Sequence, residues 1–461
     1  MRNVRPCSLP WRGIAAGALL AASCAGCSLI DPNNIIGREM GEATPPPTLF
    51  VPPPAPTTLG REARERAFDF VWRTIEERYH DPSYNGVDWK AVGERYRPMA
   101  LAARDDDAFW DVLDRMAGEL HDSHTRVEAP RDVELRRQGQ AMSLGFSFLP
   151  IGGRLAVSSV DPEADAWWAG VRPGMIVAAI GGKPASEAYA ELLAHSRSAS
   201  TARARHFAAL HRLIVGPEKS RVAFTFERAD GSRFDAALPR RTIERRRREM
   251  HRVLPSGFGY IRFSEWSLGL TLRALAGLDE LKDTPGLVID LRSNPGGSVH
   301  AVNLMLERFF AKRTELGRAT TRSGRPITLF MGAVDIIALH REVRGDPDAY
   351  RAPVVILVNA LSASGSELFA GTMQAAGRAK IVGQTSCGCL LGFLGYAHVP
   401  GGAELAYSEV GFVLANGRKI EGEGVVPDRE VPLTLEDLRA GRDRALEEAQ
   451  AILARPVEKR P

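Results

Sequence analysis

Residues 359–367 constrain the fold more than any other part of the sequence. They follow residues 353–358, a short run rich in valine that is typical of a strand buried on both faces. They precede residues 368–376, which contain helix-forming residues and no proline, and Gly377 then supplies a residue that commonly ends helices. The pattern predicts a strand, a turn that carries three serines, and a helix whose N-terminus points at those serines.

Serines in such a turn have two interpretations. Free N–H groups at a helix N-terminus stabilise negative charge, and a serine nucleophile needs that stabilisation because its tetrahedral intermediate is an oxyanion. Serine is also a favoured N-cap residue, which requires no chemistry. The local pattern alone leaves both interpretations open.

Two motifs indicate a family. Residues 362–367, Ser-Ala-Ser-Gly-Ser-Glu, resemble the nucleophile segment of the carboxyl-terminal processing (tail-specific) serine proteases, which include the tricorn-type core proteases. The resemblance implies that Ser364 is the nucleophile. Residues 286–297, which end in Asn-Pro-Gly-Gly, resemble the second motif of the family, a buried strand followed by a glycine turn. The resemblance extends over most of the chain, from residue 68 to residue 428.

The second motif also implies an oxyanion hole. Glycine has no side chain to keep a substrate carbonyl away from the backbone. The resemblance therefore implies that the N–H groups of Gly296, Gly297 and Gly365 together hold the oxyanion.

The pattern of strands and helices predicts an α/β fold, and 461 residues are enough for two or three domains. Strand patterns at 259–263, 287–291 and 354–358 alternate with helix patterns at 271–281 and 302–310, which indicates a layered α/β domain with crossover connections. The family resemblance implies a core similar to ClpP and crotonase, a spiral of ββα units. The expected order is a lipoprotein signal peptide (1–27), a Pro-rich tether (28–58), a helical cap domain (59–132), a PDZ-like domain (133–242), a ClpP/crotonase-like serine protease core (243–432) and a C-terminal helical tail (433–461).

The N-terminus resembles a targeting segment. A basic start is followed by an apolar run at 14–20, too short for a permanent membrane span, and by small residues up to Cys27. Cys27 resembles the lipidated cysteine of a bacterial lipoprotein, with Cys24 or a plain secretory signal as alternatives. Lipidation would tether the chain to a membrane. Ser28, in place of aspartate, resembles an outer-membrane address, so we expect a periplasmic protein of a Gram-negative bacterium.

Several ordered pieces between residues 143 and 182 resemble a PDZ domain. In PDZ domains the first piece is a loop whose backbone N–H groups hold the C-terminal carboxylate of a peptide that adds as a strand. A β-hairpin and a helix without a ligand are the alternative. The segment 186–215 is longer than a compact PDZ domain requires. The predicted peptide-binding residues are Ser143, Leu144, Gly145 and Phe146.

The catalytic base departs from the tail-specific pattern. Those proteases use a Ser–Lys dyad, in which burial lowers the pKa of the lysine so that its amine can accept a proton. The matching position here is Cys389. A thiol does not replace an amine as a proton acceptor at neutral pH without strong activation. Lys380 is near in sequence but falls at an apolar strand position of the family pattern, so we do not assign it the role.

The tricorn-type relatives pair the serine with a histidine from the helical cap. Apolar residues at helical spacing between residues 68 and 120 predict this cap, and Ser123 and His124 follow it in a motif that matches the Ser–His pair of those relatives. Histidine titrates near neutral pH and can accept the serine proton. The resemblance therefore implies that His124 is the base and that Ser123 positions it.

A glutamate completes the set in the tricorn-type relatives. Glu421 matches it, on the expected return strand of a hairpin whose turn is Asn416-Gly417. Glu423 is the weaker candidate. An exposed hairpin carboxylate without a catalytic role is the alternative for Glu421.

The remaining features predict no metal and no cofactor. A zinc site at His121 and His124 lacks cysteine or carboxylate partners at the usual spacing. A single residue separates Cys387 from Cys389, which would strain a disulfide, so we expect packed thiols. The basic run at 240–248 is more typical of a solvated strand or linker than of a lipid-binding surface. We expect no nucleic-acid partner, and the sequence does not define the oligomeric state.

Two functions fit the sequence. The first is a membrane-tethered serine endopeptidase that cleaves extended or unfolded polypeptides outside the cytoplasm through Ser364. The second is an inactive pseudo-protease that binds peptides or scaffolds another enzyme, which the cysteine at the lysine position would explain. Ser364, His124 and Glu421 are all present, which favours the endopeptidase.

Overall fold

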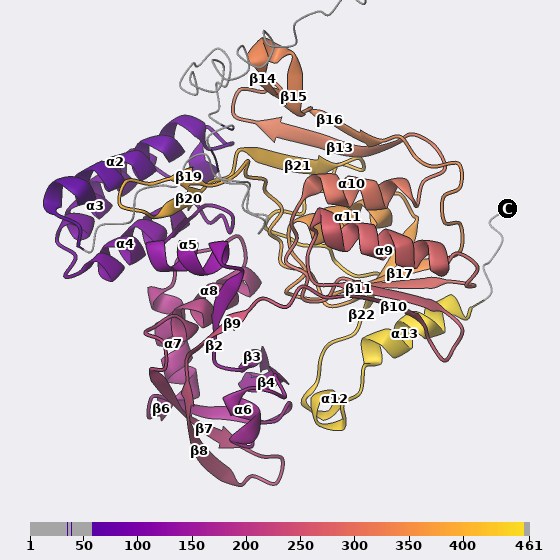
Figure 1. Cartoon of the computed structure of the whole chain (residues 1–461), viewed down its shortest axis with the longest axis horizontal. Coiled ribbons are helices and arrows are strands. Elements are labelled where there is room, and N and C mark those ends of the chain that lie inside the picture. Colours follow the sequence, from indigo (N-terminus) through magenta and orange to yellow (C-terminus); the bar gives the residue numbers. More distant parts are fainter. Residues whose placement is uncertain (1–34, 36–37, 39–57, 456–461) are drawn as a thin grey trace, which may run out of the picture.

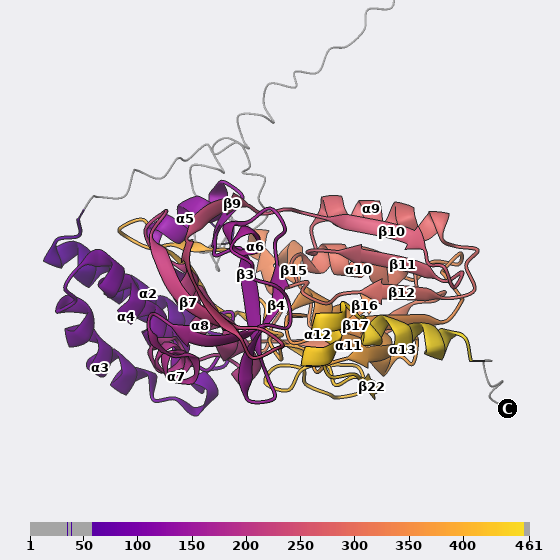
Figure 2. The same ribbon diagram turned by 90° about the horizontal axis from the view of Figure 1, so that it is seen from below.

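The computed structural model describes Ile35, Arg38 and residues 58–455. The expected signal peptide, its lipidation site at Cys27 and most of the tether lie outside the described residues. The chain forms a helical cap, a β domain and an α/β core, and the first two lie on the same side of the core (Figures 1 and 2). No helix in the described part of the chain combines the length and the apolar character needed to cross a bilayer.

A six-stranded sheet forms the centre of the core, in the order β10-β11-β12-β17-β18-β22. Five neighbouring strands run parallel and the edge strand β10 runs antiparallel. The strands are β10 (Glu249–Val253), β11 (Gly259–Phe263), β12 (Leu287–Asp290), β17 (Val354–Val358), β18 (Ala379–Gly383) and β22 (Arg429–Glu430).

Helices cover both faces of this sheet. Residues such as Ile289 and Ile356 pack in the apolar cluster of α9, α10 and α11, whereas Val288 and Val355 pack in the cluster of α13. Alternate residues of a strand point to opposite faces, so the two-sided cover explains why β17 and the first three residues of β12 are apolar. The covering helices are α9 (Leu268–Glu280), α10 (Val299–Glu307), α11 (Gly365–Ala375) and α13 (Arg444–Leu453), and a short helix, α12 (Leu435–Ala440), precedes α13.

The predicted strand, turn and helix around the serines are confirmed, with one shift of boundary. All five residues of β17 are buried. The helix begins at Gly365, three residues before the predicted start, so Ser364 is its N-cap residue. The shift places Ser366 inside the first turn of α11 and leaves Ser364 at the point where the strand-to-helix turn ends.

The cap is built from helices and from a strand pair donated by the C-terminal part of the chain. Strand β1 of the cap pairs with β20, and Leu405 of β20 is in the same apolar cluster as Phe68 and Phe109. This pairing joins the cap to the core. The elements are α2 (Arg61–Arg78), η1 (Tyr84–Gly86), α3 (Trp89–Leu101), α4 (Asp106–Gly118), β1 (Arg126–Glu128), α5 (Pro130–Arg137), β19 (Ala397–His398) and β20 (Glu404–Ala406).

A second, smaller sheet of the core has the order β16-β13-β21, and a hairpin of β14 and β15 extends beyond it. Strand β21 leads into the predicted turn, where Gly417 has a φ of +82°. The return strand that we expected is absent: only Lys419 forms an isolated bridge, and Glu421 lies in a following turn. The elements are β13 (Thr314–Thr321), β14 (Ile327–Leu329), η2 (Phe330–Gly332), β15 (Val334–Ile337), β16 (His340–Val343) and β21 (Val410–Leu414).

The β domain has a sheet in the order β3-β4-β5-β7-β8, with β6 paired to β5. The segment 186–215, longer than a compact PDZ domain requires, forms most of α7, a linker and α8. A separate pair of strands, β2 and β9, leads to the core. The elements are β2 (Gln140–Ser143), β3 (Phe146–Ile151), β4 (Arg154–Val160), α6 (Asp165–Trp168), β5 (Ile176–Ile180), β6 (Lys183–Pro184), α7 (Ala185–His195), α8 (Ala202–Ile214), β7 (Arg221–Glu227), β8 (Arg233–Pro239) and β9 (Arg241–Glu244).

The basic run at 240–248 is largely exposed, and several of its arginines pair with acidic residues. Arg241 pairs with Asp165 at 3.0 Å, and Arg247 pairs with Glu265 at 3.0 Å. These contacts agree with the prediction of a solvated strand and linker.

Candidate active site

Ser364 stands at the carboxyl end of β17 and at the N-terminus of α11. Its backbone has φ +51° and ψ −116°, a conformation that a non-glycine residue rarely adopts. Such a conformation costs about 1–3 kcal/mol and persists only where the surrounding structure fixes it. A strained serine on a sharp strand-to-helix turn is the placement that exposes a nucleophile in other hydrolases.

Glu367 fixes this turn from inside the protein. Its carboxylate accepts hydrogen bonds from the N–H groups of Ser364 (3.0 Å), Gly388 (2.7 Å) and Cys389 (2.9 Å), and from the hydroxyl of Ser386. Burial raises the pKa of Glu367, although the donors act in the opposite direction. Glu367 thus ties the serine turn to residues 386–389, called the cysteine loop below. Sequence analysis gave it no role, although Ser-x-x-Glu at a helix start is a capping-box pattern.

Two of the three predicted oxyanion donors are available. The N–H groups of Gly297 and Gly365 have no hydrogen-bond partner among residues 58–455, and a Cβ placed on Gly365 would lie 3.4 Å from the Gly297 nitrogen. The N–H of Gly296 instead donates to Asn294 Oδ1 at 3.0 Å. The structure therefore does not support Gly296 as a donor. It does lie against the nucleophile, because a Cβ on Gly296 would be 2.6 Å from Ser364 Cβ.

Trp266 and Asn294 hold the glycine turn in place, and sequence analysis missed both. The backbone of Trp266 bonds to Gly296 O (2.9 Å) and to Ser298 N (2.7 Å), on either side of Gly297. The Asn294 carbonyl accepts from Ala363 N (3.2 Å), next to the nucleophile. These contacts join the two motifs into one rigid unit.

His124 lies on the cap side of the site, in the segment between α4 and β1. Its N–H donates to Asp122 at 2.8 Å, but its ring nitrogen Nδ1 is buried without a hydrogen-bond partner in the described structure. Burial is the main cause that lowers the pKa of His124 to about 4; Arg126 and Arg197 act in the same direction, and Asp122 opposes them. The ring is therefore neutral at pH 7 and able to accept a proton. No hydrogen bond joins it to Ser364 within residues 58–455.

Ser123 makes the contact between cap and core. Its hydroxyl oxygen lies 3.4 Å from Cys389 Sγ, and the Cys389 carbonyl accepts the Ser364 N–H at 3.1 Å. Cys389 thus contacts both Ser123, the neighbour of His124, and Ser364. This arrangement brings the predicted Ser–His segment to the predicted serine, as the resemblance implied.

Glu421 reaches the same region from the turn after β21. Its Oε2 accepts the N–H of Leu390 at 2.6 Å, next to the cysteine loop, and its side chain also bonds to Ser200. Burial raises the pKa of Glu421 to about 8, and Asp122 of the cap acts in the same direction. The exposed-carboxylate alternative is therefore wrong. Glu423 is exposed, and no hydrogen bond joins Glu421 to His124 in the part of the chain that the structure describes.

The cysteine loop differs from the sequence expectation. Cys387 and Cys389 form a disulfide, where we had expected packed thiols, and both residues are buried. The loop conformation brings their Cα atoms to 5.3 Å, within the range that a disulfide can bridge. A disulfide cannot act as a base. Lys380 does not take that role either, because its Nζ pairs with Asp428 at 3.3 Å and is exposed on β18.

The predicted peptide loop is separate from these residues and lies in the β domain. Ser143 ends β2 and Phe146 begins β3, while Leu144 and Phe146 are buried in the core of the β domain. The N–H of Gly145 donates to Ser143 Oγ at 2.9 Å. That donor is occupied within the loop itself.

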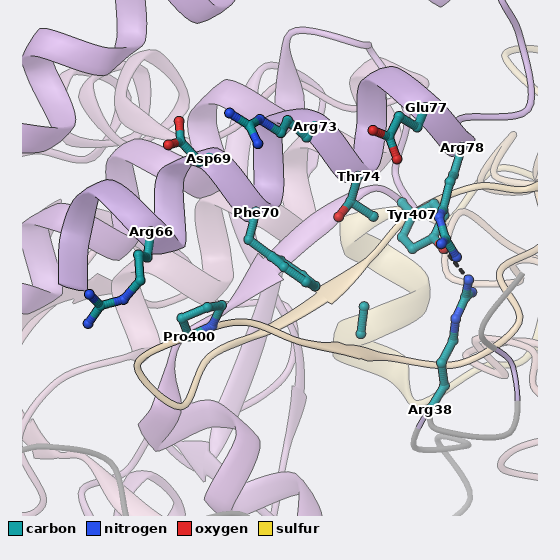
Figure 3. A pocket seen from close by; sticks show the side chains of 11 residues that line it. Arg38, Arg66, Asp69, Phe70, Arg73, Thr74, Glu77, Arg78, Pro400 and Tyr407 are labelled. Carbon is teal, nitrogen blue, oxygen red and sulfur yellow. Dashed lines mark hydrogen bonds between the residues drawn. The ribbon is translucent and has the colours of Figure 1, made fainter. Parts of the chain in front are cut away.

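A cavity of about 540 Å³ lies between α2 and the loop that joins β19 to β20 (Figure 3). None of the predicted catalytic residues lines it. Its charged groups are largely paired: Arg38 bonds to Glu409, and Asp69 bonds to Arg97. We assign this cavity no role in catalysis.

Two family models match the chain, one in the cap and one in the core. The tricorn protease C1 domain matches residues 61–118, in the cap, and peptidase family S41 matches residues 257–431, in the core. The second range includes Ser364, Glu421 and the glycine turn.

Curated relatives have names of the same kind. A putative tricorn protease homolog 2 of Streptomyces coelicolor is 26% identical over 422 residues, which cover 86% of this chain and 32% of that protein. A carboxyl-terminal-processing protease of Picosynechococcus sp. is 23% identical over 381 residues, which cover 78% of this chain and 82% of that protein. The chain therefore spans about a third of the length of the tricorn homologue.

Solved structures share the fold. The photosystem II D1 C-terminal processing protease has a TM-score of 0.55 at 23% identity and covers 85% of this chain and 97% of its own. Mature CPAF in complex with lactacystin has a TM-score of 0.64 at 16% identity and covers 85% and 98%. The core therefore matches the model of a peptidase family and shares the fold of solved processing proteases. The chain contains a peptidase family S41 domain at residues 257–431, preceded by a tricorn protease C1 domain at residues 61–118.

Proposed function

We propose that this protein is a serine endopeptidase that cleaves extended or unfolded polypeptides, with Ser364 as nucleophile and His124 as base. One observation carries the proposal: the strained Ser364 lies beside two free N–H groups, those of Gly297 and Gly365. Such donors stabilise the oxyanion of acyl transfer without reorganisation, which is commonly the largest single contribution to catalysis. A serine that served only as an N-cap would not need this cradle.

In the proposed mechanism, His124 takes the Ser364 proton as the hydroxyl attacks the scissile carbonyl. The imidazolium then gives the proton to the amine leaving group, and the acyl group remains on Ser364. Water hydrolyses this acyl-enzyme in a second step. Glu421 and Ser123 would orient and stabilise the charged ring, in place of the lysine of the tail-specific proteases. His124 is neutral at pH 7, which is the state in which its ring can accept a proton.

We further propose that the β domain is a PDZ-like domain that captures substrate C-termini, and that the core has the ClpP/crotonase-like arrangement. Strand β3 is at the edge of its sheet, which leaves an edge to which a peptide strand could add. The loop of Ser143, Leu144, Gly145 and Phe146 would hold the carboxylate, after Gly145 N–H is released from Ser143.

We place the protein in the periplasm of a Gram-negative bacterium, attached to the outer membrane by a lipid on Cys27. The support is the sequence of the first 28 residues. Growth with a radiolabelled fatty acid tests this directly: the wild-type chain should take up label, and Cys27→Ala should not.

Labelling by a fluorophosphonate probe tests the proposed activity. The protein should label once, at Ser364, and should degrade unfolded casein, whereas Ser364→Ala should do neither while keeping its melting temperature. Ser366→Ala is a matched control from the same turn, and it should still label.

A catalytically inactive pseudo-protease is the second candidate. Cys389 at the lysine position and the absence of a Ser364–His124 hydrogen bond in the described structure both favour it. A folded protein that never labels at Ser364 and never degrades casein at any pH from 6 to 10 would establish this alternative.

A further inference from the structure

The linker between α7 and α8, residues 196–201, is part of the β domain but lies at the seam between cap and core. At the cap, Ser198 Oγ lies 2.6 Å from His121 Nδ1, and a Cβ on Gly118 would be only 2.8 Å from the backbone nitrogen of Ser198. At the core, Thr201 donates to the Cys387 carbonyl at 2.6 Å. The linker therefore contacts both sides of the candidate site.

Within this linker, Ser200 contacts two of the residues that the mechanism uses. The Ser123 N–H donates to Ser200 Oγ at 3.0 Å, and the Ser200 N–H donates to Ser123 Oγ at 3.1 Å. The Ser200 side chain also bonds to Glu421. One hydroxyl thus joins the cap residue beside His124 to the acidic residue of the core.

Helix α8 fixes the linker in this place. Arg203, in its first turn, donates to the carbonyls of Ser386 and Glu423, both at 2.7 Å. Ala199 and Ala204 pack with the cysteine loop and Ala363 in a small apolar cluster. Because Ser200 lies inside this docked segment, its position is set by the β domain and not by the cap or the core alone.

We propose that Ser200 is a positioning residue for Ser123 and Glu421, so that the β domain completes the catalytic site. The inference rests on the proposed function. Ser200 does not touch the reacting atoms: it holds Ser123, and through it the segment of His124, and it directs the Glu421 carboxyl into the seam. Without its hydroxyl, Ser123 N–H and Glu421 each lose a hydrogen-bond partner.

The charge state of Glu421 gives a readout that a purely structural role would not change. Glu421 faces Asp122 from the cap, Glu367 from α11 and the phenol of Tyr79 at the end of α2. Burial and Asp122 raise its pKa, and the bond from Ser200 lowers it. Loss of that bond therefore moves the ionisation of Glu421 to higher pH.

The test compares Ser200→Ala with Ser198→Ala, a serine of the same linker whose hydroxyl bonds to His121 of the cap, and with Ser200→Thr, which keeps the hydroxyl. The rate of fluorophosphonate labelling at pH 7 should fall about tenfold in Ser200→Ala, because Ser123 N–H and Glu421 each lose a hydrogen bond. Its rise with pH should move to higher pH. Ser198→Ala should stay within about twofold of wild type, and Ser200→Thr should recover most of the rate.

Two results would overturn the proposal: labelling of Ser200→Ala at the wild-type rate and midpoint, or an equal loss in a folded Ser200→Thr. Hydrogen exchange gives a second readout that does not require activity, because the amides of Ser123 and Leu390 should exchange faster in Ser200→Ala than in wild type. If wild type never labels but this exchange difference is present, the proposed function fails and the positioning role stands. Unchanged exchange rejects the positioning role in either case.

Discussion

The core and the cap contribute to the candidate site in different ways. On the core side, Ser364 is fixed by Glu367 and lies against Gly296, with the free N–H groups of Gly297 and Gly365 beside it. On the cap side, His124 has a buried ring nitrogen without a partner, and no hydrogen bond joins the ring to Ser364 in the described chain.

The difference indicates which step is preorganised. The N–H groups proposed as oxyanion donors are in place without a substrate, whereas no hydrogen bond joins the proposed proton-transfer pair, Ser364 and His124, in the described residues. Catalytic hydrogen bonds commonly tighten only in the substrate complex. We infer that a substrate closes the cap side onto a rigid core side, and the following variants separate the two sides.

The largest effect should come from His124 on the cap side. His124→Ala should lower kcat/KM by about 10³-fold or more, because the serine loses its proton acceptor, as in other enzymes with a serine and a histidine. The control is His121→Ala, which removes a nearby exposed cap histidine whose ring, among the described residues, bonds to Ser198 alone. Hydrolysis of a peptide substrate checks both. Activity retained in His124→Ala would remove the cap from the mechanism.

On the core side, Gly297→Ala should lower kcat by about 10²- to 10³-fold, with little change in KM. A Cβ there would lie 2.4 Å from the Trp266 carbonyl oxygen, and φ is +140°, so the turn must shift and its N–H with it. Gly60→Ala is the control, because its Cβ would meet nothing within 4 Å. A wild-type kcat in Gly297→Ala would show that this N–H does not hold the oxyanion.

The pH dependence should report the acidic residue at the seam. Glu421, with a pKa of about 8, is protonated at pH 7 and becomes a carboxylate above pH 8, where it can stabilise the His124 imidazolium. His124, with a pKa of about 4, is already neutral across this range. Therefore kcat/KM should rise several-fold between pH 6.5 and 9, and Glu421→Gln should flatten the rise. A wild-type profile that falls over this range, or an unchanged rise in Glu421→Gln, contradicts the assignment.

The smallest effect should come from the cysteine loop. The double variant Cys387→Ala/Cys389→Ala removes the disulfide but leaves the backbone acceptor for Ser364 N–H, so kcat/KM should change by less than about threefold. Casein degradation with and without a dithiol reductant gives the same comparison in wild type. A dead double variant that still folds would mean that the loop carries a catalytic role.

Local patterns in the sequence predicted the core side of the site well. The apolar run before the serines became β17, because it is buried on both faces, and the helix after them became α11. The glycine turn came close to Ser364 as the motif implied. The motif did not predict that the Asn294 side chain accepts a hydrogen bond from the N–H of Gly296, because this depends on a side-chain rotamer in the folded turn.

The seam was much less predictable. Ser200 has no motif of its own and reaches the site only because α7 and α8 place their linker between cap and core. The Cys387–Cys389 disulfide depends on the loop conformation that Glu367 imposes. The spacing of the two cysteines in the sequence does not predict that conformation. The turn that carries Glu421 was predicted as a strand, because the hairpin signal at Asn416-Gly417 was extended past the single bridge at Lys419.

A crystal structure of the Ser364 phosphonate adduct would test the central claim most directly. The measured quantity is the separation between Ser364 Oγ and the nearer ring nitrogen of His124. If His124 accepts the serine proton, Ser364 Oγ and the ring nitrogen should lie within hydrogen-bond distance, about 2.6–3.2 Å. The phosphonyl oxygen should accept hydrogen bonds from the N–H groups of Gly297 and Gly365. A ring that stays out of hydrogen-bond reach in the adduct, with another group or an ordered water in its place, would contradict it.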